Sequence, residues 1–132
     1  MAPVLRAPYA DFKGENDMKR VAILRCLKSS ASCAASMCVE AWKNSKTYGE
    51  ETVEVTCVWT CNGCGEYMLP DPDGSKLRKK IDRMKILKLD ALHLPHCTVK
   101  ENGEGEKILC SNISVIAEEL SKEGIVIIQG KP

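Results

Sequence analysis

The sequence has few aromatic residues and no long apolar run. Only 5% of its 132 residues are aromatic, whereas 44% are hydrophobic, so the core must be built mainly from aliphatic side chains. No apolar run approaches the roughly 20 residues that a membrane-spanning helix needs. The N-terminal segment also lacks the hydrophobic stretch of a secretory signal. We therefore expect a chain that is neither inserted in a membrane nor secreted.

The sequence also lacks an excess of charge and the common catalytic motifs. Nineteen basic and 18 acidic residues give a formal net charge of +1, which argues against nucleic acid as the main partner. The sequence contains no G-x-G-x-x-G, no G-x-x-x-x-G-K-[ST] and no G-x-S-x-G, so dinucleotide-binding, nucleotide-binding and serine-hydrolase functions have no motif support. A binding protein is favoured over an enzyme.

Cysteine, by contrast, is abundant. Eight cysteines in 132 residues are about four times the ordinary frequency. Without a secretory signal we expect a reducing compartment, the cytoplasm, in which disulfides are disfavoured. Clustered cysteines in such a compartment are more often metal ligands or redox groups. We therefore expect the cysteines to be free or metal-bound.

Hydrophobic patterning predicts an alternation of strands and helices. Short apolar runs that are typical of buried strands cover residues 21–24, 52–60, 91–94 and 125–128. Between them, apolar residues at helical spacing cover residues 33–43, 75–88 and 111–122, with Ser75 and Ser111 as expected N-caps. The order β-α-β-α-β-α-β implies a mainly parallel sheet covered by helices.

We therefore predict a single three-layer α/β domain with a four-stranded sheet of the Rossmann or flavodoxin kind. The domain is expected to span residues 19–132. Residues 1–18 are expected to form a flexible N-terminal arm.

The cysteines sort to one edge of the predicted sheet. In a parallel sheet the carboxyl ends of all strands lie at the same edge. Seven cysteines follow a predicted strand or precede the last helix, and these are Cys26, Cys33, Cys38, Cys61, Cys64, Cys97 and Cys110. Cysteines scattered through a core would not be expected to sort in this way.

Cys57 is the exception, because it lies inside the second predicted strand. Strict alternation places it on one face with Val53, Val55 and Trp59. It lies about 13 Å along the strand from Cys61, too far to share one metal ion with it. We expect Cys57 to behave as a small buried hydrophobic residue.

The C-x-x-C motif at Cys61–Cys64 has three interpretations. It could form half of a metal site, a redox dithiol, or a turn with two buried thiols. A loop with two prolines follows the motif, so no helix starts just after Cys61 to activate a redox thiol. A metal site needs more ligands, and the other cysteines of the edge can supply them.

The supply of thiols and the scarcity of histidine favour a sulfur-rich metal centre. His96, next to Cys97, is a candidate ligand, whereas His93 is expected in the core. Spacing alone does not separate zinc from an iron–sulfur cluster. The favoured hypothesis is an iron–sulfur cluster that serves electron transfer or cluster handling. The alternatives are a zinc module, or a thiol-disulfide or sulfur-transfer enzyme that uses Cys61 and Cys64.

The predicted helix over residues 75–88 is strongly basic. It carries seven basic residues, which are Lys76, Arg78, Lys79, Lys80, Arg83, Lys85 and Lys88. A solvated helix face is the simpler interpretation. The functional alternative is a docking surface for an acidic redox partner protein.

Taken together, the motifs resemble those of the CGGC domain family, a group of small cysteine-rich prokaryotic proteins. The similar stretches are VAILRC, SCAASMC, TYGEETVEV, TCNGC, LHLPHC, CSNI and GIVIIQG. They extend from about Arg20 to Gly130. The resemblance implies metal binding through the seven edge cysteines and a histidine. Asn62 stands where the family usually has glycine, and Cys57 also stands where glycine is frequent.

Overall fold

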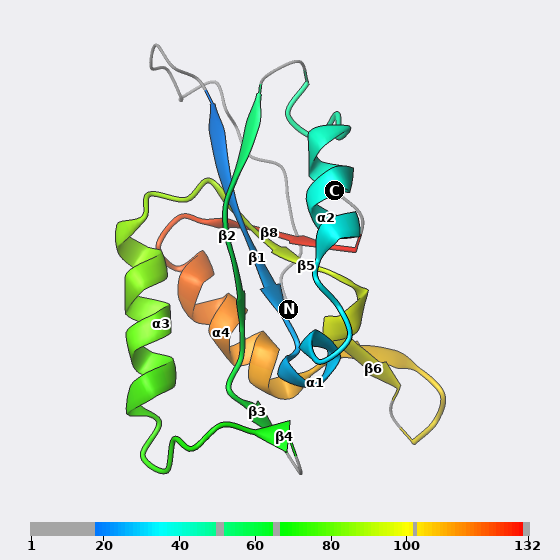
Figure 1. Cartoon of the computed structure of the whole chain (residues 1–132), viewed down its shortest axis with the longest axis vertical. Coiled ribbons are helices and arrows are strands. Elements are labelled where there is room, and N and C mark those ends of the chain that lie inside the picture. The colour runs from blue at the N-terminus through cyan, green and yellow to red at the C-terminus, as the bar shows by residue number, and fades with distance from the viewer. Residues whose placement is uncertain (1–17, 50–51, 65–66, 102, 131–132) are drawn as a thin grey trace.

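The structure is a computed structural model that describes residues 18–49, 52–64, 67–101 and 103–130. Its main sheet has the strand order β2-β1-β5-β8 (Figure 1). These strands are β1 (Lys19–Arg25), β2 (Val53–Thr60), β5 (Ala91–Leu94) and β8 (Val126–Gln129). All neighbouring pairs are parallel, so the predicted α/β domain with a four-stranded parallel sheet is confirmed. The expected arm, apart from Met18, lies outside the described residues.

Helices cover both faces of the sheet. Helix α2 (Ser36–Lys43) lies on one face, and α3 (Ser75–Ile86) and α4 (Ser111–Ser121) lie on the other (Figure 1). Val21 and Ile23 pack against the α2 side, while Ala22 and Leu24 pack against α3 and α4, because alternate side chains of a strand point to opposite faces. No helix in the described ranges is long and apolar enough to cross a membrane.

Short elements at the carboxyl ends of the strands were not predicted. They are α1 (Leu27–Ser30), the 3-10 helix η2 (His96–Thr98), the hairpin of β3 (Gly63–Cys64) with β4 (Tyr67–Met68), and the hairpin of β6 (Val99–Glu101) with β7 (Lys107–Leu109). All of them carry or adjoin cysteines, so they form the structure around the candidate site.

The expected N-caps are wrong by one residue. The N-caps of α3 and α4 are Gly74 and Cys110, and the serines are the first helical residues. At α3 the carboxylate of Asp71 accepts the backbone N–H groups of Lys76 and Leu77, at 2.8 and 3.0 Å. These bonds satisfy N–H groups that a helix leaves free at its start, and they lower the pKa of Asp71.

Strand β2 contains a β-bulge. Val21 pairs with Val55, but the next residue, Ala22, pairs with Cys57. Thr56 is therefore an extra residue, and an extra residue reverses the alternation of side chains beyond it.

The bulge corrects the predicted faces of β2. Val53 and Val55 pack on the α2 side, whereas Cys57 and Trp59 pack on the side of α3 and α4. The prediction that these four residues share one face is wrong. Cys57 itself is half-buried, with its Sγ 3.8 Å from Met84 Sδ, and burial raises the pKa of its thiol.

His93 is a buried histidine with both ring nitrogens bonded. Trp42 Nε1–H donates to His93 Nδ1 at 3.0 Å, and His93 Nε2–H donates to the carbonyl oxygen of Gly130. The ring is thus a neutral tautomer, because Nδ1 must accept. Burial lowers the pKa of His93, and the charge of His96 also lowers it. The hydrogen bond to the Gly130 carbonyl raises this pKa, but burial has the larger effect.

We predict that His93 makes the fold less stable in mild acid. The unfolded chain takes up the proton near pH 6.5, whereas the folded chain resists it until a lower pH, so the free energy of unfolding falls as the pH drops below 6.5. Urea unfolding between pH 7.5 and pH 5, in chelator and reductant, measures this loss. His96→Gln, at an exposed position, is expected to keep most of it, because burial is the main cause of the lowered pKa of His93, and His93→Gln is expected to lack it. Equal pH profiles for the two variants would contradict the assignment.

Candidate metal centre

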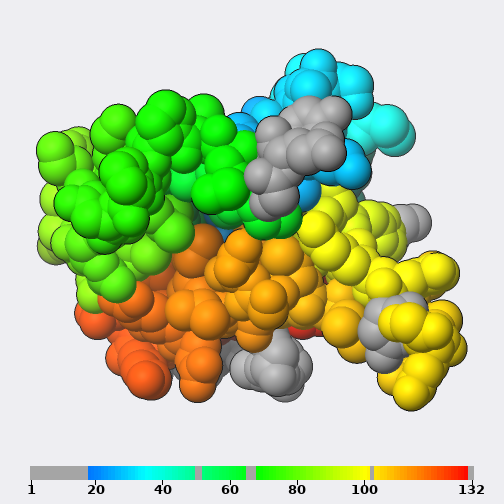
Figure 2. All heavy atoms as spheres, turned by 90° about the horizontal axis from the view of Figure 1, so that it is seen from below, coloured from blue at the N-terminus to red at the C-terminus, as the bar shows by residue number. Residues whose placement is uncertain are grey.

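Parallel pairing brings the carboxyl ends of the main strands to one edge of the sheet. Cys26 follows β1, Cys61 and Cys64 follow β2, Cys97 follows β5, and Cys110 precedes α4. Figure 2 looks onto this edge, where segments that are far apart in the sequence meet. All eight cysteines are free.

Four of these thiols form a group, which we call the four-thiol group: Cys26, Cys33, Cys38 and Cys97. The backbone N–H of Cys26 donates to Cys97 Sγ at 3.4 Å. Burial raises the pKa of Cys38, and the thiolates of Cys33 and Cys97 raise it further. Burial also raises the pKa of Cys97. The hydrogen bond from the Cys26 N–H acts to lower this pKa, whereas the charges of Cys26 and Cys33 raise it further. Cys97 is therefore linked through these charge effects to each of the other three thiols.

An unusual turn positions Cys33. Ala35, the N-cap of α2, has a φ of 63° in the left-handed region, a conformation that costs a residue with a Cβ about 1–2 kcal/mol. Its side chain is buried, and its backbone N–H donates to Cys33 Sγ at 3.3 Å. The turn thus directs a hydrogen-bond donor at the thiol. Sequence reasoning missed it, because no glycine marks the position.

Arg25 places a positive charge beside the four-thiol group. Its Nη1–H donates to the carbonyl oxygen of Cys33, and its charge acts to lower the pKa values of Cys38 and Cys97, although burial dominates and both stay raised. Its Nε is buried, with no hydrogen-bond partner among the described residues. That N–H is a donor without an acceptor beside a cluster of thiols. In the sequence, only the position of Arg25 next to Cys26 indicates that this arginine belongs to the candidate site.

Cys61 lies apart from this group, on the side of α3 and α4. Its side chain is 5% exposed and belongs to the core cluster on that face. Lys80 Nζ, from α3, donates to the carbonyl oxygen of Thr60 at 2.8 Å and to Asn62 Oδ1 at 2.7 Å. Asn62 Nδ2 in turn donates to Asp71 Oδ2 at 3.0 Å. The start of the C-x-x-C turn is therefore held by α3 and the loop before it.

The remaining candidate ligands occupy different surroundings. Cys64 is exposed, with its Sγ 4.0 Å from Lys100 Nζ. Cys110 is half-buried, and its backbone N–H donates to the carbonyl oxygen of Thr98 at 2.8 Å, which places it next to η2. His96 is exposed. A ligand role for these residues stays a prediction.

The four-thiol group has the donor atoms of a thiolate-bound metal site. Thiol donors, backbone N–H groups directed at sulfur and a nearby guanidinium suit a bound group of negative charge. However, within the described ranges no set of three or more Cys, His, Asp or Glu side chains is arranged so that it could hold a metal ion.

A comparison with models of protein families finds a match. The model of the CGGC domain matches residues 20–131, which is nearly the whole chain. No curated protein matches the sequence, and no solved structure matches it.

We predict that Lys80 stabilises the C-x-x-C turn. Lys80→Met keeps most of the aliphatic stem but leaves the carbonyl of Thr60 and the amide oxygen of Asn62 without their donor, which is expected to cost about 1–3 kcal/mol. Lys79→Met, on an exposed neighbour, is the control and is expected to change stability by less than about 0.5 kcal/mol. Urea unfolding in reductant measures both. Equal losses in the two variants would show that the bonds of Lys80 contribute nothing.

Proposed function

Because the chain belongs to the CGGC domain family and carries eight cysteines, we propose that it binds a metal centre through thiolates at the carboxyl edge of its sheet. Cys26, Cys33, Cys38 and Cys97 are the proposed first ligands. The observation that carries the proposal is their grouping: three separate stretches of the chain bring Cys97 within range of Cys26, through a hydrogen bond, and of the charges of Cys33 and Cys38.

We favour an iron–sulfur cluster over a single zinc ion because seven thiols at this edge and only two histidines in the chain make a sulfur-rich set of ligands. Four thiolates are the usual complement of such a cluster. A zinc ion can take the same donors, so the zinc module stays the alternative. When bound, an iron–sulfur cluster supplies one-electron chemistry.

The surrounding residues of the chain would hold and tune such a group. The N–H groups of Cys26 and Ala35 already donate to thiol sulfurs, and hydrogen bonds to sulfur help to set the potential of a cluster. The guanidinium of Arg25 offsets part of the negative charge of four thiolates, and its free Nε–H offers another donor. Cys61, Cys64, Cys110 and His96 are proposed as further ligands at the same edge, and the reducing cytoplasm as the compartment.

The basic helix is proposed to receive an acidic redox partner. Arg78 and Lys85 are ion-paired with Glu119, and Lys80 is bound to the end of β2. Lys76, Lys79 and Arg83 are exposed, and their spacing of three and four residues places them along one side of α3. Binding through these charges would weaken as salt is added.

We predict that the protein purified without oxygen is brown and contains iron and sulfide. Cys97→Ser is expected to lose the visible absorption and most of the metal, because it removes a central member of the four-thiol group. Cys57→Ala is the matched control, since Cys57 packs against Met84 of α3, between the sheet and that helix, and it is expected to keep the wild-type metal content.

Metal analysis and visible spectra of the three proteins make the test. Colourless protein with stoichiometric zinc would contradict the iron–sulfur cluster and support the zinc module. Wild-type protein without metal, or a full metal content in Cys97→Ser, would overturn the proposed ligands.

A further inference from the structure

The C-x-x-C turn contains an Asn-Gly pair, Asn62 and Gly63. Asparagine is a thermolabile residue, because the backbone nitrogen of the next residue can attack its carboxamide carbon. Glycine in the next position has no Cβ to hinder that approach. Whether the reaction runs at this turn depends on how freely the Asn62 side chain can rotate toward the nitrogen of Gly63.

The carboxamide of Asn62 is held at both of its ends. Its Oδ1 accepts a hydrogen bond from Lys80 Nζ at 2.7 Å, and its Nδ2 donates to Asp71 Oδ2 at 3.0 Å. Asn62 is only 8% exposed, and its carbonyl oxygen accepts the backbone N–H of Leu69 at 2.9 Å. Rotation of the carboxamide toward Gly63 would break both side-chain bonds and leave buried polar groups without partners, which is costly.

The two groups that hold Asn62 are themselves fixed in place. Asp71 accepts the backbone N–H groups of Lys76 and Leu77 at the start of α3. Lys80 Nζ also donates to the carbonyl oxygen of Thr60 at 2.8 Å. We call Lys80 and Asp71 the Asn62 anchor, because neither can follow the carboxamide without losing other bonds.

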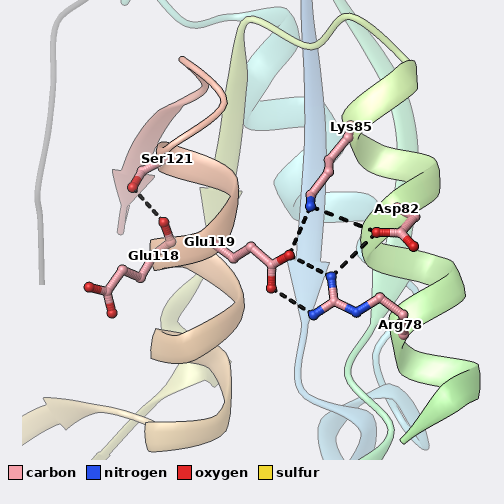
Figure 3. A network of polar contacts seen from close by, with 6 residues as sticks. All are labelled: Arg78, Asp82, Lys85, Glu118, Glu119 and Ser121. Carbon is pink, nitrogen blue, oxygen red and sulfur yellow. Dashed lines mark hydrogen bonds and ion pairs between the residues drawn. The ribbon is translucent and has the colours of Figure 1, made fainter.

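The helix that carries Lys80 is in turn tied to α4. Arg78 Nη2 donates to Glu119 Oε1 at 2.8 Å, and Lys85 Nζ lies 2.9 Å from Glu119 Oε2 (Figure 3). These partners lower the pKa of Glu119 to about 2, so its carboxylate stays charged at neutral pH. The ion pairs join α3 to α4 and hold the backbone from which Lys80 reaches the turn.

Water has access to the turn. Asn62 and Gly63 line a cavity of about 370 Å³ between α3, α4 and the segment around β4. Met68 and Val115 line the same cavity and are 62% and 65% exposed, so the cavity opens to solvent. The anchoring of the carboxamide, rather than the supply of water, therefore limits the reaction.

We infer that Asn62 is a deamidation site that the Asn62 anchor holds back, and that it converts when the anchor opens. The nitrogen of Gly63 loses its proton and forms a bond to Asn62 Cγ, and the amide nitrogen leaves as ammonia. Water then opens the resulting succinimide at either carbonyl carbon, which gives aspartate or isoaspartate. Water is the sole co-reactant, and the inference goes beyond the proposed metal centre and does not depend on it.

Conversion would change the turn lastingly. The new carboxylate lacks the N–H donor that Asp71 now accepts, and it places a second negative charge where the amide lies 3.0 Å from Asp71. Isoaspartate also routes the backbone through the former side chain, and so lengthens the main chain between Cys61 and Cys64. The modified turn would therefore lose its attachment to the loop before α3.

The test follows Asn62 in the full chain, kept folded in mildly alkaline buffer with reductant, by peptide mass spectrometry over weeks. We expect Asn62 to convert at least about tenfold more slowly in the folded chain than in the chain unfolded by urea. Lys80→Met is expected to raise the folded rate about tenfold, because loss of its bonds increases the population of the open turn. Lys79→Met, on an exposed neighbour, is the control and is expected to leave the rate unchanged.

Two further controls separate local opening from global unfolding and from changes in the solution. Ile23→Val removes a methylene from the core on the α2 side, which lowers overall stability but is expected to leave the Asn62 rate unchanged. Asn102 and Gly103 form a second Asn-Gly pair in the sequence and serve as the internal reference. Asp71→Asn weakens the other half of the anchor and repeats the test should Lys80→Met unfold, which far-UV circular dichroism checks.

Three results would overturn the inference. They are an Asn62 rate in Lys80→Met that equals or falls below that of the wild type, an equal acceleration in Ile23→Val, and equal rates in the folded and unfolded chains. Metal content, measured on fresh protein before any conversion, tests the proposed function separately. Protein that holds its metal but shows an unprotected Asn62 would refute this inference alone.

Discussion

The parallel pairing of β1 with both β2 and β5 is the constraint on which the rest of the structure depends. Val21, Ala22, Ile23 and Leu24 are fully buried between the two helical layers, and burial of each large aliphatic side chain contributes about 1.5–3 kcal/mol. From this central strand the chain crosses to β2 on one side, and β5 leads to β8 on the other. Ligands of open parallel sheets bind where the strand order reverses in this way. Here Cys26 and Cys97 meet at that point through a hydrogen bond.

Charge compensation divides the edge into separate surroundings. Arg25 lies with the four-thiol group, Lys80 acts near Cys61, and Lys100 lies beside Cys64. Each cation comes from a different element, so each of the three surroundings has its own compensating charge. The four-thiol group is the proposed metal site, whereas Cys61 is buried in the core cluster on the side of α3 and α4.

The sequence predicts the parts of this structure that depend on local pattern. Apolar runs and helical spacing gave the four main strands and three main helices, and parallel topology then placed the cysteines at one edge. The resemblance to the CGGC domain is likewise confirmed by the family match.

Features that depend on contacts between distant residues were not predictable in this way. The bulge at Thr56 arises from pairing with β1, and it changed the face on which Cys57 lies. The left-handed Ala35 has no sequence signal, and neither does the reach of Lys80 from α3 to the end of β2.

X-ray absorption at the edge of the bound metal tests the central claim most directly, because it reports the atoms around the metal. The account predicts a first shell made mainly of sulfur at about 2.3 Å and, for a cluster, a second shell of metal atoms. A first shell dominated by nitrogen or oxygen would contradict a thiolate centre at this edge of the sheet.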